Sequence, residues 1–385
     1  MRFSNPWALA LPAAGLLAFA CCSGAEPVPK APEGKDLVVH EWGTFSTFSG
    51  SDGKNLKFYP YDNDLPEFVH GYEGRYSKAG PQGGTISLET PVLYFYAERP
   101  VTASVQVEFP KGTITEWYPH AVRTAKKLSW EGIKVLSGEN VKFANEKKES
   151  RYYAARETDA APLRVTFKEE EAKIMEQERF LFYRGVGSFD MPLSVRAQGE
   201  GKFTVRWSGE ELKDEMFLVR VQGGKVRFVT FRVDQRSKCS YEAEVRLPDS
   251  DSTVEKLSEA LVKRLTEKGL YGMEALAMVK TWRSAWFGEE GTRVLYLLPE
   301  AFTEELLPLK VEPKPAKQLR VLVGRHDVLT PERERQIDTL VAELKRPTLE
   351  QDAKQRAAWQ ELGKLGRYHE AAQTQAEARL RNKRQ

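Results

Sequence analysis

Three glutamates lie in short aromatic-rich phrases and are the best candidates for acid–base chemistry. Glu41 follows His40 in His-Glu-Trp-Gly-Thr-Phe, Glu89 lies in Leu-Glu-Thr-Pro, and Glu116 lies in Thr-Glu-Trp-Tyr-Pro. Burial among aromatic rings raises the pKa of a carboxyl group, and two carboxylates in different surroundings can supply an acid and a base or nucleophile. With His40 or Arg156 tuning them, a pair drawn from these three predicts a hydrolase, with glycans as the substrate class.

The same glutamates also have a structural interpretation, which stays open. Glu41, Glu89 and Glu116 would then be buried and satisfied by Arg156, by Arg123 or by backbone N–H groups at strand ends. Carboxylates with perturbed pKa values occur in structural ion-pair networks as well as in active sites. The sequence therefore leaves the question of an enzyme undecided.

Aromatic side chains in these phrases support a second hypothesis, a non-catalytic binding protein. Tyrosine and tryptophan rings bury a large area and also have a hydroxyl or N–H group that forms hydrogen bonds. They therefore suit contacts with an envelope polymer or a protein partner. The candidates are Trp42, Trp117, Tyr118, Tyr152 and Tyr153. We favour this hypothesis because no recognised catalytic pattern occurs in the chain, and it requires the rings to be exposed.

Metal and cofactor sites are not indicated by the spacing of ligand-type residues. The five histidines are scattered, without a His-x-His or His-Glu-x-x-His pattern. Asp62, Asp64 and Glu67 are weak candidates for a calcium loop, but their spacing departs from the EF-hand template after its start. Gly185 and Gly187 lack the third glycine of a dinucleotide loop, and there is no P-loop. We expect no metal and no cofactor.

Cysteine usage excludes a disulfide framework. Of the three cysteines, Cys21 and Cys22 lie in the N-terminal segment, so Cys239 alone belongs to the body of the protein. Without a clear histidine partner, Cys239 is expected to be a buried small apolar residue and not a nucleophile.

The first residues have the layout of an export signal. Arg2 precedes an almost wholly apolar run from Trp7 to Ala20. That run is shorter than the roughly 20 residues that a membrane-spanning helix needs. No later run is apolar for long enough to cross a bilayer, so we expect an exported protein whose only membrane contact is a lipid anchor.

The end of the signal segment is similar to a bacterial lipobox. Leu-Ala-Phe-Ala-Cys ends at Cys21, so residues 1–21 predict a signal peptide of the lipoprotein type, with lipidation at Cys21. Ordinary cleavage after Ala20 or Ala25 stays open. Residues 22–36 are rich in proline and predict an extended tether. The expected location is the periplasm, the outer membrane as a lipoprotein, or the outside of the cell.

A β-rich body, residues 37–248, must position the candidate side chains. Apolar and polar residues alternate through Val101–Phe109, which predicts a half-buried antiparallel strand, and Gly223-Gly224 between two alternating runs predicts a hairpin. Further strands are expected at 86–97, 163–167, 180–183, 202–207 and 241–247. This pattern predicts an α+β fold, mostly an antiparallel β-sandwich or open barrel with C-terminal helices.

The pattern changes at residue 249, where helical spacing begins. A capping box at Ser252–Glu255 starts one helix, and a second helix carries Trp282 and Trp286 on one apolar face, so we interpret both tryptophans as core. Apolar stretches at 292–298 and 319–323 are predicted strands that return to the sheet. Residues 249–325 are therefore expected to pack on the β-rich body.

Residues 326–385 are predicted to form a basic helical tail. From Lys314 to the end there are 16 lysines and arginines against 10 acidic residues, whereas the whole chain has a formal net charge of +3. Solvated helices with cations near their C-terminal ends explain such a pattern. Nucleic acid is not an expected partner, because no basic motif interleaved with aromatic residues occurs.

Five phrases together resemble a family of exported bacterial proteins from planctomycete- and myxobacterium-like organisms. They are His40–Phe45, Glu89–Tyr96, Thr115–Pro119, Phe180–Gly185 and Met278–Arg283. The resemblance runs from about Val38 to Pro331 and implies export. No activity is assigned to the family, so no functional role carries over to these residues. The helical tail falls outside the resemblance, and we expect the body to tolerate its loss.

Overall fold

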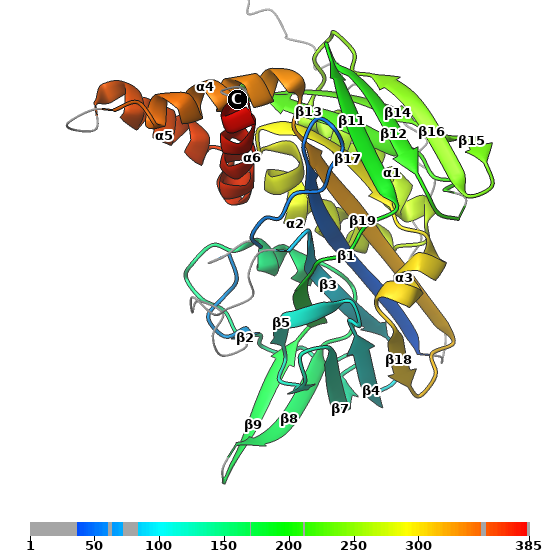
Figure 1. The fold of residues 1–385 in the computed structure, drawn as a ribbon. Helices are drawn as coiled ribbons and strands as arrows, with labels where there is room; N and C mark the ends of the chain where they lie inside the picture. Colours follow the sequence, from blue (N-terminus) through cyan, green and yellow to red (C-terminus); the bar gives the residue numbers. More distant parts are fainter. Residues whose placement is uncertain are drawn as a thin grey trace, which may run out of the picture.

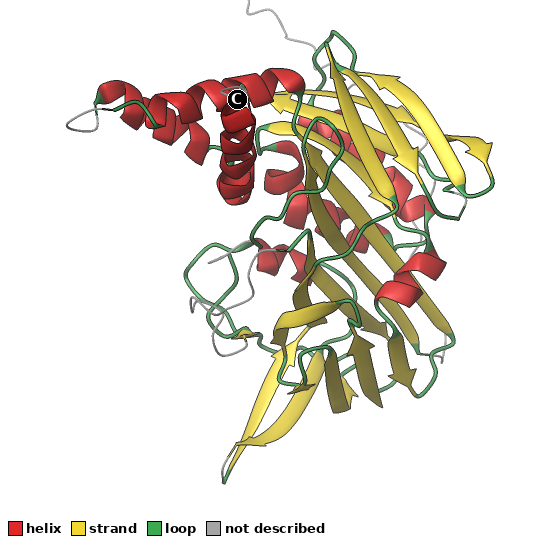
Figure 2. Cartoon of the chain, viewed as in Figure 1, coloured by secondary structure: helices red, strands yellow, loops and turns green. Residues whose placement is uncertain are grey.

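The computed structural model describes residues 37–60, 64–71, 84–169, 171–210, 212–347 and 352–382. The predicted α+β class, with mostly antiparallel sheets and C-terminal helices, is confirmed. Figure 2 shows that strands make up most of the body, whereas helices lie behind the large sheet and at one end. Among the described residues, no helix is long and apolar enough to span a membrane. Cys21 and the expected signal and tether segments lie outside the described residues.

A nine-stranded sheet forms the centre of the fold (Figure 1). Its strands, in spatial order, are β14 (Lys225–Phe231), β13 (Met216–Gln222), β17 (Gly291–Leu297), β19 (Lys317–Val328), β1 (Val38–Ser49), β3 (Ile86–Tyr96), β10 (Leu181–Gly187), β5 (Gly112–Tyr118) and β2 (His70–Gly71). β1 and β19 pair in parallel, and the other neighbours pair antiparallel. The hairpin predicted at Gly223-Gly224 is confirmed as β13–β14.

Two smaller antiparallel sheets accompany the central one. The first is four-stranded, in the order β11 (Leu193–Gly199), β12 (Lys202–Trp207), β16 (Ser240–Arg246) and β15 (Asp234–Ser237). The second has the order β18 (Leu309–Glu312), β4 (Val101–Glu108), β7 (Lys127–Val135), β8 (Leu163–Glu169) and β9 (Ala172–Glu178), and β6 (Val122–Arg123) also pairs with β7.

Helices lie on both sides of the central sheet and form the tail. They are η1 (Arg151–Arg156), α1 (Val254–Glu267), α2 (Gly272–Phe287), α3 (Glu300–Leu306), α4 (Pro331–Leu344), α5 (Ala353–Gly363), η2 (Gly366–Tyr368) and α6 (His369–Asn382), where η marks a 3-10 helix. In Figure 1 the tail helices α4, α5 and α6 gather at one end of the molecule, opposite the projecting β8–β9 hairpin.

The alternation of side chains along β1 divides the interior into two cores. Val39 and Phe45 join a core shared with the two smaller sheets, whereas Val38 and Trp42 join a core shared with α1 and α2. Successive residues of a strand point to opposite faces, so a strand covered on both sides is apolar along its whole length. Every residue of β1 is buried, as this arrangement requires.

The two helices and two strands predicted between residues 249 and 325 occur, but α3 and β18 were not predicted, and one strand is longer than expected. α1 and α2 pack on the central sheet, and Trp282 and Trp286 are fully buried, which confirms their assignment to the core. The strand expected at 319–323 continues to Val328. Its extension carries Arg325 and Asp327, which neutralise each other, so the charged residues did not end the strand.

Two expectations are corrected by the packing. Cys239 is exposed, at the turn between β15 and β16 with φ +57°, so it is not the buried apolar residue that we expected. The tail, expected to be dispensable, shares a hydrophobic cluster with the body. That cluster contains Phe48, Phe58 and Leu329 from the body and Ile337, Val341, Leu362, Tyr368, Ala372 and Ala376 from the tail.

Candidate functional site

A bulge between β1 and β3 brings two of the aromatic phrases together. The register shifts so that Gly43 alone faces Thr90 and Pro91. A Cβ on Gly43 would lie 2.8 Å from Pro91 Cα, so only glycine fits, and Thr90 has φ +53°. Directly beside the bulge Glu89 pairs with Thr44, and its side chain faces α2 and the tail.

The five phrases that carry the family resemblance meet at this place. His40–Phe45 lies on β1, Glu89–Tyr96 on β3, Phe180–Gly185 at β10 and Thr115–Pro119 at β5, which are four adjacent strands. Met278–Arg283 lies on α2, which covers them. The five phrases are far apart in the sequence, so this convergence could not be predicted from the sequence.

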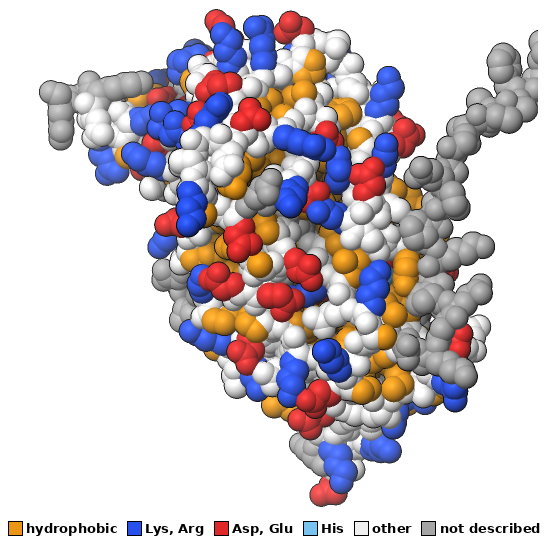
Figure 3. Space-filling model, turned by 90° about the vertical axis from the view of Figure 1, so that its right-hand side faces the viewer, with side chains coloured by type: hydrophobic (Ala, Val, Ile, Leu, Met, Phe, Trp, Pro, Cys, Tyr) orange, Lys and Arg blue, Asp and Glu red, His pale blue; other side chains and the backbone are white. Residues whose placement is uncertain are grey.

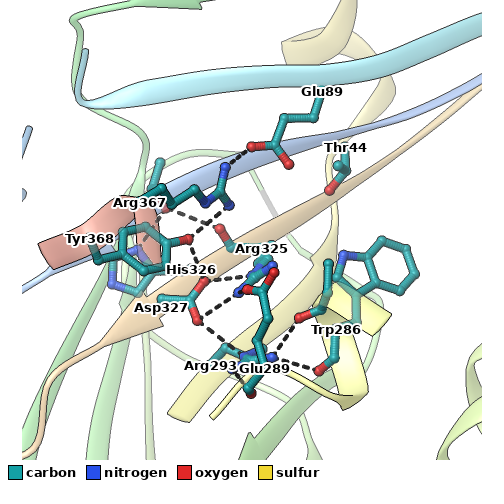
Figure 4. A network of polar contacts seen from close by, with 12 residues as sticks. Thr44, Glu89, Trp286, Glu289, Arg293, Arg325, His326, Asp327, Arg367 and Tyr368 are labelled. Carbon is teal, nitrogen blue, oxygen red and sulfur yellow. Dashed lines mark hydrogen bonds and ion pairs between the residues drawn. The ribbon is translucent and has the colours of Figure 1, made fainter. Parts of the chain in front are cut away.

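A network of buried ion pairs joins Glu89 to the tail (Figure 4). Arg367, from η2, forms an ion pair with Glu89, and the two side chains are 6% and 0% exposed. The neighbouring Tyr368 hydroxyl donates to Asp327 Oδ2 at 2.9 Å, and Arg325 Nε donates to the same oxygen at 2.6 Å. The tail thus places two polar side chains against the central sheet.

Arg293 connects this network to the end of α2. Its Nη1 donates to the carbonyl oxygens of Ala285 and Trp286, at 2.7 and 2.8 Å, and its Nη2 donates to that of Glu289 at 2.6 Å. The last carbonyls of a helix have no partner within the helix, and a cation also complements the negative end of the helix dipole. Arg293 Nε lies 3.1 Å from Asp327 Oδ1, which ties the helix end to β19.

The pKa values in the network follow from burial and charge balance. Burial opposes ionisation of Asp327, but Arg325 and Arg293 outweigh it and lower the pKa of this carboxyl to about 2. Burial lowers the pKa of Arg293, and the Asp327 carboxylate opposes that shift. On the other face of β19, burial lowers the pKa of His326 to about 4, and its ring nitrogens contact the Thr47 and Ser49 hydroxyls.

A second group of ion pairs lies around Arg184 of β10. Its two Nη atoms each donate to an Asp64 oxygen at 2.9 Å, and Arg151 Nη2 donates to Asp64 Oδ2 at 2.6 Å. Burial raises the pKa of Asp64, but Arg184 and Arg151 outweigh it and hold that pKa well below its usual range. Burial opposes the charge on Arg184, whereas Asp64, Glu116 and Glu89 raise its pKa. Glu89 and Glu116 therefore both stabilise the charge on Arg184.

Glu41 and His40 lie away from Glu89 and have partners of their own. Glu41 lies on the opposite face of β1, where it accepts from Tyr183 Oη at 2.7 Å and Arg320 Nε at 2.6 Å. His40 Nδ1 lies 2.9 Å from Glu274 Oε2 of α2. Glu41 pairs with Arg320, and Glu89 pairs with Arg367. Neither arginine is one that the structural interpretation named.

Arg156 and Glu116 are placed by other contacts. Arg156 binds Glu178, with Nη2 to Oε2 at 2.6 Å and Nε to Oε1 at 2.9 Å. The Thr115 hydroxyl donates to Glu116 Oε2. Arg156 is therefore occupied by a glutamate that was not among the candidates.

The candidate aromatic residues differ in accessibility. Trp42, Tyr118 and Tyr152 are buried, at 0%, 3% and 1% exposure, whereas Trp117 and Tyr153 are partly exposed. Tyr153 lines an open depression of about 450 Å³, named here the η1 depression. Its other lining residues are Glu149, Ser150, Arg151, Ala154, Glu157 and Lys280.

The weak metal candidates do not form a site. Asp64 forms ion pairs with Arg151 and Arg184, and Glu67 is exposed. Asp62 lies outside the described residues. Across the described ranges, no group of three or more histidine, cysteine or acidic side chains is placed to hold a metal ion.

Surface charge shows no dominant sign on the face drawn in Figure 3. Lysine and arginine side chains are interspersed there with aspartate and glutamate, and apolar atoms lie between them. Binding on this face would therefore depend on local shape and pairing, since a broad field of one sign is missing from it.

Sequence reasoning missed the arginines and the aspartate of the network. Arg293, Arg325, Asp327 and Arg367 were attributed to strands or to a solvated tail. Arg325 and Asp327 stand two residues apart directly after an apolar run, a spacing that puts both on one face of a strand. That spacing was the available signal. Nothing local marks Arg367 as a partner for Glu89.

Comparisons with known proteins add no function. No model of a known protein family matches the chain, and no curated protein matches it. Among solved structures, it is similar to the yeast delta-COP-I mu-homology domain, with a TM-score of 0.30 and 7% identity over 78% of this chain and 100% of that one. The same domain complexed with a Dsl1 WxWxV peptide gives a TM-score of 0.26 and 9% identity over 77% and 100%. Likeness at this level carries no argument about this chain.

Proposed function

We propose that this chain is an exported, non-catalytic binding protein of the cell envelope, anchored by lipid at Cys21, and that it binds a glycan polymer. The observation that supports it best is the η1 depression, which an aromatic candidate, Tyr153, lines. Glu41, Glu89 and Glu116, the carboxylates considered for catalysis, are not among its lining residues. This depression therefore contains one of the binding candidates and none of the carboxylate candidates.

The chemistry of the η1 depression suits a polar polymer. A tyrosine ring offers an apolar face for a sugar ring, and the Glu157 carboxylate, which Lys280 Nζ contacts at 2.6 and 2.7 Å, offers acceptors for its hydroxyl groups. Ser150 and Arg151 also line the depression, and both donate to Asp64. Two of these groups are held in place, because the Tyr153 hydroxyl accepts from the Glu146 N–H at 3.1 Å and Arg151 is bound to Asp64. A preformed site binds with less loss of conformational entropy.

The positions of the carboxylates favour binding over hydrolysis. A glycosidase needs two carboxyl groups on either side of the scissile bond. Glu41 and Glu89 lie on opposite faces of the sheet, and each is paired with a buried arginine.

Retention on purified peptidoglycan tests the binding function. We expect the mature chain to be retained, and Tyr153→Ala and Lys280→Ala to weaken retention at least tenfold. Tyr59→Ala is the matched control, because Tyr59 is a 44% exposed tyrosine outside the depression. Equal retention of all three variants would remove the depression from consideration, and release of reducing ends would support the hydrolase instead.

Fractionation of cells tests the anchor separately. We expect the wild-type chain in the membrane fraction and Cys21→Ser in the soluble fraction of the envelope. Cys22→Ser is the control, since the lipobox places the acceptor at Cys21. If Cys21→Ser stays with the membrane, lipidation at this residue is excluded.

A further inference from the structure

Five buried polar atoms on β1 and β3 have no hydrogen-bond partner in the part of the chain that the structure describes, and three of them lie together at one end of this strand pair. They are Ser46 Oγ, Ser87 Oγ and Glu89 Oε2, on residues that are 0%, 1% and 0% exposed. Buried polar groups in folded proteins are nearly always satisfied by protein or by ordered water. Three unsatisfied groups close together therefore indicate a site for something polar.

The sheet register places the three groups on one face. Ser46 lies directly opposite Ser87, and Thr44 lies directly opposite Glu89. Residues two apart in a strand share a face, so Ser87 and Glu89 point the same way. Opposite Cβ atoms in an antiparallel pair are about 5 Å apart. One ligand group can therefore reach both serines and the free oxygen of Glu89.

The charges around this face select a neutral ligand. Three arginines, Arg293, Arg325 and Arg367, are balanced by Glu289, Asp327 and Glu89. An ammonium group would add positive charge beside the guanidinium groups, and a phosphate would oppose the buried Glu89. A hydroxyl group is neutral, donates to the carboxylate, and both donates to and accepts from a serine.

We propose that Ser46, Ser87 and Glu89 form a binding site for a neutral sugar or polyol, named the serine–glutamate site, and that η2 of the tail is its cover. This goes beyond the function proposed above, because it concerns a second, enclosed site. It shares with that function only the class of ligand.

Two residues of η2 contact the body. Arg367 forms the ion pair with Glu89, and the Tyr368 ring stacks on Phe48 with centroids 4.4 Å apart and contacts Phe58 at 5.2 Å. Figure 4 shows both side chains reaching from the tail toward the sheet. Movement of η2 away from β1 would expose the serine–glutamate site, so loosening these contacts should increase the fraction of molecules that can bind.

Calorimetric titration of the full mature chain with N-acetylglucosamine trimer and with cellotriose tests the proposal. Arg367→Ala should bind at least one trisaccharide at least tenfold more tightly than the wild type. Adding Ser87→Ala to Arg367→Ala should weaken that binding at least tenfold. Ser49→Ala is the matched control, since Ser49 is a β1 serine whose hydroxyl bonds to His326 on the opposite face.

Hydrogen exchange on the wild-type chain keeps the test decisive if Arg367→Ala does not fold. Saturating trisaccharide should slow exchange in β1 and β3 and speed it in η2. No binding to either chain, or binding that Ser87→Ala leaves unchanged, would overturn the proposal and leave ordered water as the occupant. Binding that is lost in Tyr153→Ala but not in Ser87→Ala would support the η1 depression while overturning the serine–glutamate site.

Discussion

Arg367 and Glu89, 278 residues apart in sequence, form a buried ion pair that fastens the tail to the central sheet. The pair lies beside the β1–β3 bulge, so the last fifth of the chain contacts the first strand pair of the fold. A buried pair of this kind makes the stability of the body depend on the tail.

Arg367→Ala should lower the free energy of unfolding by about 3–5 kcal/mol, because it leaves Glu89 buried without its counter-charge. Urea denaturation followed by tryptophan fluorescence measures the change. Arg335→Ala removes an exposed arginine of the tail, with a side chain that is 68% exposed, and should change stability by less than about 1 kcal/mol. Equal effects of the two substitutions would mean that the Arg367–Glu89 ion pair contributes no more to the free energy of unfolding than an exposed arginine does.

His326 should make the protein lose stability in mild acid. A histidine in an unfolded chain titrates near pH 6.5, whereas burial lowers the pKa of folded His326 to about 4. The unfolded state then binds more protons between these values, so the contribution is complete above pH 6.5 and declines as the pH falls to 4, by about 3 kcal/mol in all. Unfolding free energies at pH 7.5 and 4.5 should differ by that much more in the wild type than in His326→Gln, and parallel curves would refute the assignment.

Arg293→Met should fray the end of α2. The substitution removes the donors to the carbonyls of Ala285, Trp286 and Glu289, and hydrogen bonds to charged groups contribute about 1.5–3 kcal/mol each. We expect faster amide exchange in the last turn of α2 and a loss of at least about 3 kcal/mol. Arg283→Ala, on the exposed side of the same helix, should leave exchange in that turn unchanged.

Gly43→Ala should destabilise the β1–β3 bulge. The new methyl group would lie 2.8 Å from Pro91 Cα, a backbone atom that cannot rotate away, so we expect a loss of about 1–3 kcal/mol. Gly363→Ala is the control, because a Cβ there meets nothing within 4 Å. Thermal unfolding should show a lower midpoint for Gly43→Ala alone, and a lower midpoint for both variants would count against the steric explanation.

Local patterns predicted several strands because alternation is a property of neighbouring residues, but β5, β7, β9 and β11 were not predicted. The run Val101–Phe109 became β4 over Val101–Glu108, and Gly223-Gly224 became a hairpin turn. The end of β19 was missed because a pattern of apolar residues stops at a charge, whereas Arg325 and Asp327 stay in the strand by pairing with each other.

The candidate site could be predicted only in part. The aromatic surroundings of Glu41, Glu89 and Glu116 correctly indicated burial. Their main partners were not predictable, since Arg320 is 279 residues from Glu41 and Arg367 is 278 from Glu89. Ion pairing at such separations depends on the strand order of the whole sheet, which no local phrase contains.

The parallel pairing of β1 with β19 also sets the order of events during synthesis. Residues of β1 leave the ribosome 279 positions before the residues that face them, as in the pair Glu41 and Arg320. The middle of the central sheet therefore stays unpaired on one edge until nearly the entire chain is available, and contacts this distant form slowly. A polypeptide with this topology can complete its central sheet only after β19 has been made.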